Sequence, residues 1–147
     1  MTLKKVQLNK IVKNQLPTYV RDEFPLVGEF LSASATSPVV RMAQPNMDID
    51  SVIDTRVVFQ EEKDTCLFEQ MPQVFFPNKG VYGLRDYEKI FCSDNTHGHD
   101  IFDLRKINRG HGCMVIVRPD QYIANVLPLD ATSDVSDFFA GFMLPNE

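Results

Sequence analysis

Apolar residues recur at helical spacing in one part of this chain and form a continuous run in another. Over residues 1–33 the apolar side chains recur at roughly helical spacing, and Pro17 and Pro25 interrupt them. We therefore expect short helices that restart at the prolines, where a proline disturbs a helix least. Residues 52–59 instead form a run rich in β-branched side chains, which predicts a buried strand. The clearest positions of the helical stripe are Val20, Phe24, Val27, Phe30 and Leu31.

Two apolar segments near the C-terminus predict a β-hairpin. Residues 113–117 and 122–127 have the composition of strands, and Pro119 and Asp120 stand between them. Proline presets the φ angle that a turn needs, and aspartate favours turns because its side chain bonds nearby backbone groups. The two strands are therefore expected to pair antiparallel.

The segments around the hairpin have weaker patterns. Residues 134–142 place apolar side chains at helical spacing, which predicts a terminal helix with Ser133 or Asp134 as its N-cap. Residues 86–90 suit a helical turn or a short strand, and residues 101–107 suit a short extended piece. The order of helices, strand, irregular segment, hairpin and helix places the chain in the α/β class. A strand followed by an antiparallel hairpin and a terminal helix is the second half of a thioredoxin-like fold.

Composition narrows the classes of function. The chain has 147 residues and a net charge of −5, which fits one domain with a core and argues against a nucleic-acid partner. No apolar run approaches the ~20 residues of a membrane span, and no apolar segment follows the N-terminal lysines, so neither a membrane partner nor a signal peptide is expected. Cys66, Cys92 and Cys113 form no C-x-x-C pair, which argues against a redox enzyme and favours a cytoplasmic protein.

The hairpin region is also where the chain resembles a known family. Residues 112–124 strongly resemble the last hairpin of the phenol hydroxylase family of FAD-dependent aromatic hydroxylases. The signature of this hairpin is Arg118, Pro119, Asp120, Gln121 and Tyr122. Further segments resemble the 3-hydroxybenzoate 4-monooxygenase branch of the family and stand in the same order. These segments are residues 37–41, 54–60, 82–89, 100–105, 126–130 and 138–142.

The resemblance implies a C-terminal, thioredoxin-like domain that lost its redox cysteines and serves dimerisation. In the family this domain follows an FAD-binding domain and a substrate domain, and the whole enzyme uses FAD and NADPH to hydroxylate a phenolic acid. The implied partners are a second copy, in a homo-oligomer, or the flavin and substrate domains. The chain has no G-x-G-x-x-G fingerprint, so we expect it to bind neither cofactor and to be inactive alone. We assign no catalytic, cofactor-binding or metal-binding residue.

The N-terminal part departs from the family. Residues 1–25 weakly resemble the start of a phage baseplate-type structural protein, which leaves a phage structural or adaptor protein as the alternative function. We therefore divide the chain into a helical segment of uncertain origin, residues 1–30, and a hydroxylase domain, residues 31–147. The first strand of a thioredoxin-like sheet is central, so its loss would leave backbone groups unpaired. Either residues 4–12 supply a replacement strand, or the sheet is truncated at its N-terminal strand.

Several polar side chains could have a chemical role, but each has a simpler structural interpretation. His97, His99 and the more distant His111 could bind a metal together with nearby aspartates, yet they stand in polar segments where histidines are usually solvated. Arg118 and Asp120 could suggest catalysis, yet a hairpin turn needs these residue types for backbone reasons alone.

The same comparison applies to the remaining candidates. Cys113 could be a nucleophile, but it begins an apolar strand, where a cysteine usually acts as a small buried hydrophobe. Residues 86–89 are charged and predict a solvated face, with an interface as the second interpretation. Phe138, Phe139 and Phe142 are expected in the core, and one of them could instead face a partner subunit.

Overall fold

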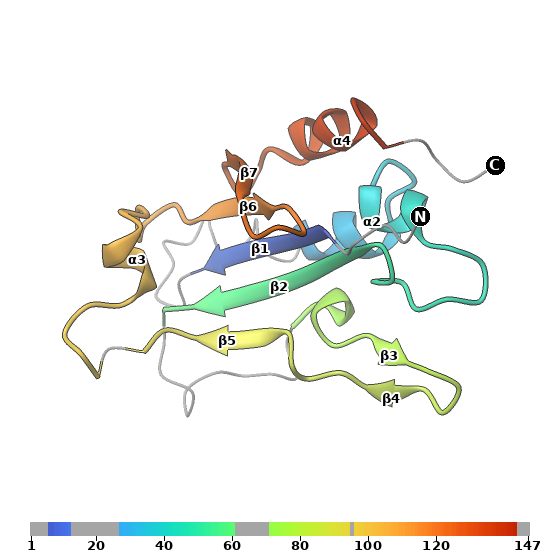
Figure 1. The fold of residues 1–147 in the computed structure, drawn as a ribbon, viewed down its shortest axis with the longest axis horizontal. Coiled ribbons are helices and arrows are strands. Elements are labelled where there is room, and N and C mark those ends of the chain that lie inside the picture. The colour runs from blue at the N-terminus through green and yellow to red at the C-terminus, as the bar shows by residue number, and fades with distance from the viewer. Residues whose placement is uncertain (1–5, 13–26, 61–70, 95, 144–147) are drawn as a thin grey trace.

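A computed structural model of the chain describes residues 6–12, 27–60, 71–94 and 96–143. Its main feature is a five-stranded sheet with the strand order β5-β2-β1-β6-β7 (Figure 1). The strands are β1 (Val6–Val12), β2 (Ile53–Phe59), β5 (Ile90–Cys92), β6 (Cys113–Val117) and β7 (Ile123–Leu127). The strands expected at residues 52–59, 113–117 and 122–127 are therefore confirmed, each to within one residue at either end.

Strand β1 lies in the centre of the sheet. It pairs in parallel with β2, with Val6 opposite Ile53, and antiparallel with β6, with Gln7 opposite Val117. The helical expectation for residues 6–12 was therefore wrong, and the sheet is not truncated at its N-terminal strand. These residues supply the replacement strand, which gives the backbone groups of both neighbours their partners. The helical expectation for residues 13–26 lies outside the described residues.

The order and directions of the strands have a thioredoxin-like arrangement, as expected. Two parallel strands, β1 and β2, are joined through a helical crossover, because parallel neighbours cannot be joined by a tight turn. The crossover includes the helical residues 27–33 and α2 (Pro38–Met42). The antiparallel pair β6 and β7 and the helix α4 (Thr132–Ala140) follow. Because β1 shares a sheet with these elements, the division at residue 30 does not separate two folded units, and it stays a proposal about origin.

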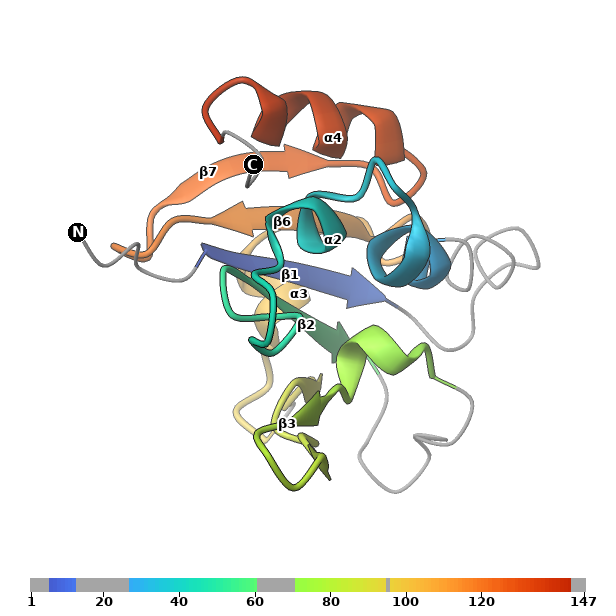
Figure 2. The same ribbon diagram turned by 90° about the vertical axis from the view of Figure 1, so that its right-hand side faces the viewer.

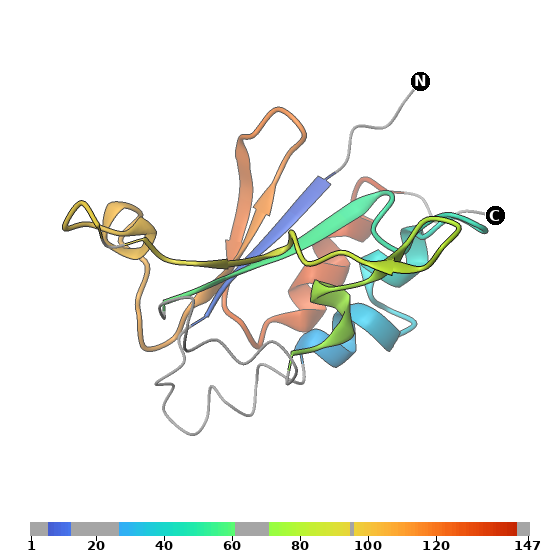
Figure 3. The same cartoon turned by 90° about the horizontal axis from the view of Figure 1, so that it is seen from below.

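The helices cover one face of the sheet. Helix 27–33, α2 and α4 lie on the same side of the strands, and α3 (Ile101–Leu104) lies apart from them beyond one end (Figures 2 and 3). The side chains buried between sheet and helices include Leu31, Val57, Ile116 and Phe139. A one-sided core of this kind leaves the opposite face of the sheet without a helical cover.

Helix α4 differs from the expected terminal helix in its N-cap and in the burial of its last phenylalanine. Its N-cap is Ala131, which makes no side-chain capping bond, so the expected cap at Ser133 or Asp134 was wrong, and both residues lie inside the helix. Phe139 is buried as expected, whereas Phe142 follows the helix and is 60% exposed. The expectation that Phe142 belongs to the core was therefore wrong.

Two segments between β2 and β6 also differ from the expected structure. Residues 101–107 contain α3 instead of an extended piece, because Asp100 accepts hydrogen bonds from the backbone N–H groups of Phe102 and Asp103 and so caps a helix. Of residues 86–90, where a helical turn or a short strand was expected, only Ile90 belongs to a strand, β5, and residues 86–89 connect it to β4 (Leu84–Arg85) as turn and irregular backbone.

A second, small sheet stands apart from the main one. Strands β3 (Asn78–Lys79) and β4 pair antiparallel, with Asn78 opposite Arg85, and the short helix η3 (Gln73–Phe75) precedes them. Within the described ranges, no helix combines the length and the apolar character that crossing a lipid bilayer requires.

Candidate association surface

The uncovered face of the main sheet carries a mostly apolar groove, whose lining also includes Arg56, Arg105 and Gln121. Alternate residues of a strand point to opposite faces, so the β6 residues Met114 and Ile116 enter the core while Val115 and Val117 point to the other face. An open groove of about 520 Å³ runs over that face. Its apolar lining includes Val58, Phe91, Ile107, Val115, Ile123 and Val126.

The groove reaches the edges of the sheet, where its side chains become exposed. Phe91 on β5, and Ile123 and Val126 on the edge strand β7, are each more than a third exposed. Contiguous apolar surface of this kind marks an interaction site in a folded domain. We refer to this surface, lined as above, as the open sheet face.

A second apolar surface projects from the molecule. Residues 78–85, which we call the arm, contain β3, a tight turn and β4, and they extend away from the main sheet (Figure 1). The turn is closed by a hydrogen bond from the N–H of Gly83 to the carbonyl of Gly80, and both glycines have positive φ angles, 59° and 65°. Glycine adopts this conformation without steric cost. Val81 and Tyr82 at the turn, and Leu84 just after it, are exposed.

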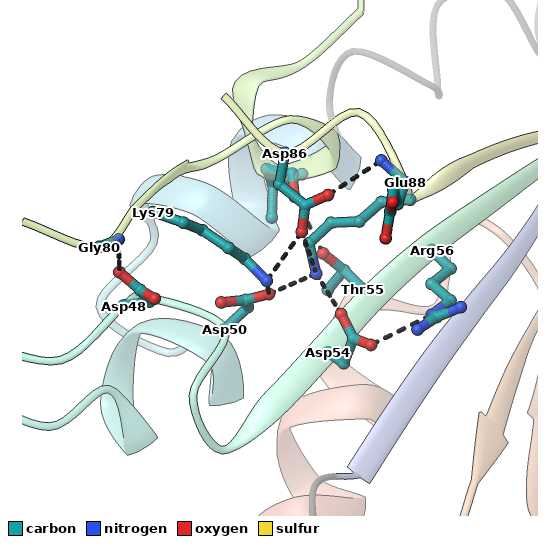
Figure 4. Close-up of polar contacts among 11 residues, drawn as sticks. Asp48, Asp50, Asp54, Thr55, Arg56, Lys79, Gly80, Asp86 and Glu88 are labelled. Carbon is teal, nitrogen blue, oxygen red and sulfur yellow. Dashed lines mark hydrogen bonds and ion pairs between the residues drawn. The ribbon is translucent and has the colours of Figure 1, made fainter. Parts of the chain in front are cut away.

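Charged residues hold the base of the arm (Figure 4). The ammonium of Lys79 lies 2.8 Å from a carboxylate oxygen of Asp50 and 2.8 Å from one of Asp86. The N–H of Gly80 donates a hydrogen bond of 2.9 Å to Oδ1 of Asp48. Asp48 and Asp50 belong to the loop before β2, so these contacts join the arm to a segment about 30 residues earlier in the chain.

Lys89 completes this charged network from the inside. Its side chain is buried, and its ammonium forms ion pairs with the carboxylates of Asp50 and Asp54. Asp86 is half-buried beside it, while Glu88 is exposed. The expectation of a solvated face over residues 86–89 was therefore wrong for Lys89, because carboxylates from the loop before β2 and from β2 itself compensate its buried charge.

The electrostatics of the network favour the ionised forms. Burial by itself would raise the pKa of Asp86, but the hydrogen bonds from Lys79 and the N–H of Glu88, together with the charges of Lys79 and Lys89, outweigh it and lower the pKa. For Lys79 burial acts to lower the pKa, and hydrogen bonds and charges from Asp50 and Asp86 outweigh it and raise the pKa. The network consequently stays charged at neutral pH, and the arm keeps its attachment.

A second ion-pair network fixes α3 at the end of the open sheet face. The guanidinium of Arg109 contacts both carboxylate oxygens of buried Asp100, at 3.0 and 2.6 Å, and it reaches Asp103 at 2.6 Å. Burial acts to raise the pKa of Asp100, but the hydrogen bonds and charge of Arg109, together with the N–H groups of Phe102 and Asp103, outweigh it and lower the pKa. The side-chain amide of Gln60, just after β2, donates to the carbonyl of Arg109 at 3.0 Å. Helix α3 is thereby tied to the end of the sheet.

The signature hairpin makes its contacts within itself. The N–H of Gln121 donates to the carbonyl of Arg118 at 2.9 Å, and the N–H of Arg118 donates to the carbonyl of Tyr122 at 2.9 Å. Gln121 has a φ angle of 70°, which is the conformation that follows a type I turn in a three-residue hairpin loop. The 2.7 Å ion pair between Arg118 and Asp120 joins two exposed side chains. Pro119 lies between them, so the five residues form a turn.

The histidine and cysteine candidates do not meet at one site. His97, His99 and His111 are exposed, and in the part of the chain that the structure describes no three His, Cys, Asp or Glu side chains gather as metal ligands do. Cys92 and Cys113 are free thiols, and burial raises the pKa of Cys113, which disfavours the nucleophilic thiolate.

Comparison with known proteins gives concordant matches. The family described as the phenol hydroxylase C-terminal dimerisation domain matches residues 18–147. A 3-hydroxybenzoate 4-monooxygenase from Comamonas testosteroni is 44% identical over 115 residues, which cover 78% of this chain and 18% of that protein. The FAD-dependent monooxygenase terD from Aspergillus terreus is 37% identical over 110 residues, which cover 72% of this chain and 18% of that protein.

A solved structure is also similar to this chain. A thioredoxin-like protein from Parabacteroides distasonis aligns with 93% of this chain and 83% of its own, at 13% identity and a TM-score of 0.46. The chain spans 18% of the length of both monooxygenases. Since the family match extends over most of the sequence, the chain belongs to the family of phenol hydroxylase C-terminal dimerisation domains.

Proposed function

We propose that this chain acts as the association domain of an FAD-dependent aromatic-ring monooxygenase of the 3-hydroxybenzoate 4-monooxygenase or phenol 2-monooxygenase type. The observation that supports the association role is the open sheet face, which the family's description as a dimerisation domain accounts for. An apolar sheet face exposed to water is unfavourable unless another surface covers it. The partner is a second copy of the chain, or the flavin and substrate domains of the parent enzyme.

The proposal includes the absence of an active site in this chain. FAD and NADPH would bind to other parts of the parent enzyme, because this sequence lacks the G-x-G-x-x-G segment that brings a pyrophosphate to a helix N-terminus. The buried thiol of Cys113 has no cysteine at C-x-x-C spacing, which argues against dithiol chemistry. The domain would contribute to hydroxylation only by assembling the enzyme.

Location and alternative functions follow from the same residues. The free thiols of Cys92 and Cys113 suit the reducing cytoplasm, where we propose that the protein acts without nucleic-acid or membrane partners. The phage structural alternative rests on residues 1–25, and it gains no support from β1, which completes the sheet of this domain.

Light scattering coupled to size-exclusion chromatography tests the association role on the parent enzyme with and without the whole domain, strand β1 included. We expect deletion to convert an oligomer into monomers, and an unchanged oligomeric state would contradict the proposal. Visible absorbance of this chain tests the proposal that it binds no flavin. We expect a colourless protein, and bound flavin would contradict the proposal that the chain has no cofactor site.

A further inference from the structure

The arm presents more apolar surface than any role within this fold requires. Val81 is 99% exposed, Tyr82 is 89% exposed and Leu84 is 70% exposed. Tyr87, which follows the arm, is 57% exposed. Single exposed apolar residues are common on protein surfaces, but a group of four within seven positions of one projecting segment is typical of a contact surface.

The arm is also held in place before any partner binds. Lys79 links it to Asp50 and Asp86, the N–H of Gly80 is bonded to Asp48, and the N–H of Asp86 is bonded to the carbonyl of Pro77 at 3.0 Å. A segment fixed in this way loses little conformational entropy on association. The exposed side chains are therefore presented by a preorganised element.

The composition of the arm resembles the centre of a protein interface. Residues 80–84 read Gly-Val-Tyr-Gly-Leu and carry no charge, while Lys79, Arg85 and Glu88 flank them. Interface centres are depleted in charged residues and enriched in tyrosine, and their rims are polar. The same arrangement, an uncharged tip with a charged border, occurs here on one hairpin.

We propose that the arm is a contact element through which this chain binds a second copy of itself. This inference rests on the proposed association function and adds the arm to the open sheet face as a second contact surface of the domain. The area is of the required size. A buried tyrosine contributes about 150–250 Å², so Tyr82 and Tyr87, together with Val81 and Leu84, supply most of the ~800 Å² that each partner of a standard interface buries.

A second copy is the occupant that the family supports. The matching family is a dimerisation domain, and its match over residues 18–147 includes the whole arm. A two-fold axis would bury two arms in one dimer, which doubles the contribution of each exposed side chain. Contact of the arm with the flavin or substrate domain of the same polypeptide is the alternative that the experiment distinguishes.

Sedimentation velocity over a concentration series of the full 147-residue chain tests the proposal. The test variant is Tyr82→Ser/Leu84→Ser, and the matched control is Leu104→Ser, because Leu104 is 68% exposed but lies on α3. Val81→Asp is a second test variant, in which a fully exposed position receives a charge without disturbing the core. Circular dichroism during thermal unfolding confirms that each variant is folded.

We expect both test variants to raise the dimer dissociation constant at least tenfold, while Leu104→Ser leaves it unchanged. Equal weakening by Leu104→Ser would contradict the proposal, since the effect would not be specific to the arm. A wild-type dimer that all variants leave unchanged would contradict the arm's role and retain the association function. A wild-type chain that remains monomeric would contradict the arm's role and any association with a second copy, and it would leave the flavin and substrate domains as the partner.

Discussion

The ammonium of Lys79 lies 2.8 Å from a carboxylate oxygen of Asp50, and this contact joins the base of the arm to the loop before β2. Asp50 is buried, whereas the arm that Lys79 belongs to projects into solvent. The exposed apolar residues and the buried charges are therefore parts of one arrangement, in which the charges hold the arm in position.

Replacing Lys79 by methionine should loosen the arm while the main sheet stays folded. The side chain of Lys79 is 29% exposed, and Asp50 keeps Lys89 as a second partner, so the loss should stay below the ~3–5 kcal/mol of breaking a fully buried ion pair. Hydrogen–deuterium exchange should therefore speed up at residues 78–86, with little change in β2 and β6. The control is Lys106→Met, at an exposed position outside the arm. Unchanged exchange in the arm would show that Lys79 does not hold it.

Replacing Lys89 by methionine should be much more damaging. This change leaves the buried carboxylates of Asp50 and Asp54 without the ammonium between them, and removing one partner of a buried ion pair costs about 3–5 kcal/mol. Urea unfolding measures the loss. Lys89→Met/Asp54→Asn should recover part of it, because one of the two carboxylates that lost Lys89 is then neutral, while Asp50 keeps Lys79 as a partner. If Lys89→Met lowers the free energy of unfolding no more than Lys106→Met does, the side chain of Lys89 is solvated.

Stability should fall in acid, in part through Asp100. Burial would raise the pKa of this carboxyl, but Arg109 and the backbone N–H groups of Phe102 and Asp103 together lower it below the ordinary value of about 3.9. A carboxyl whose pKa is lower in the folded state stabilises the fold above the unfolded-state pKa, and it loses that contribution as the pH falls through the folded-state pKa. The urea midpoint should therefore drop as the pH is lowered below about 4.

The variant Asp100→Asn isolates this contribution. It should be less stable than the wild type at pH 7, because the ion pair with Arg109 is lost, and its urea midpoint should depend less steeply on pH. Asp103→Asn is the milder comparison, since Asp103 contacts the same guanidinium from an exposed position. If wild type and Asp100→Asn have parallel pH profiles, the pKa of Asp100 is not lowered by folding.

The signature hairpin offers a test of its structural role. Gln121 has a φ angle of 70°, a conformation in which a side chain is strained and glycine is not. We expect Gln121→Gly to stabilise the chain by up to ~1 kcal/mol, and Gln121→Val, with its branched Cβ, to destabilise it. Thermal unfolding of the two variants measures both effects. Destabilisation by glycine would show that the Gln121 side chain matters more than its backbone.

The sequence predicted those parts of the fold whose signals are local. Strands β2 and β6 are apolar runs bounded by polar residues, and α4 carries its buried residues at helical spacing. Strand β1 was missed because its alternation, Val-Gln-Leu-Asn, ends after four residues at Lys10. Its structure is decided by pairing with β2 and β6, and a window of neighbouring residues contains neither partner.

The candidate site was less predictable for the same reason. Lys89 stands in a charged run, and only the carboxylates of Asp50 and Asp54, more than 30 residues earlier, explain its burial. Tyr82 likewise has a large aromatic side chain of the kind that is often buried in a core. It is exposed because the hairpin that carries it projects from the molecule. One signal was present in the sequence: Gly80 and Gly83 bracket two residues, as the turn of a hairpin does.

The mass of the purified chain in solution tests the central claim most directly. Light scattering at about 100 μM, well above the micromolar limit of weak standard-size interfaces, should give twice the 16.8 kDa of one chain. The mass should fall toward that of one chain on dilution. A mass of 16.8 kDa at the highest concentration would contradict the proposal that this domain associates with itself.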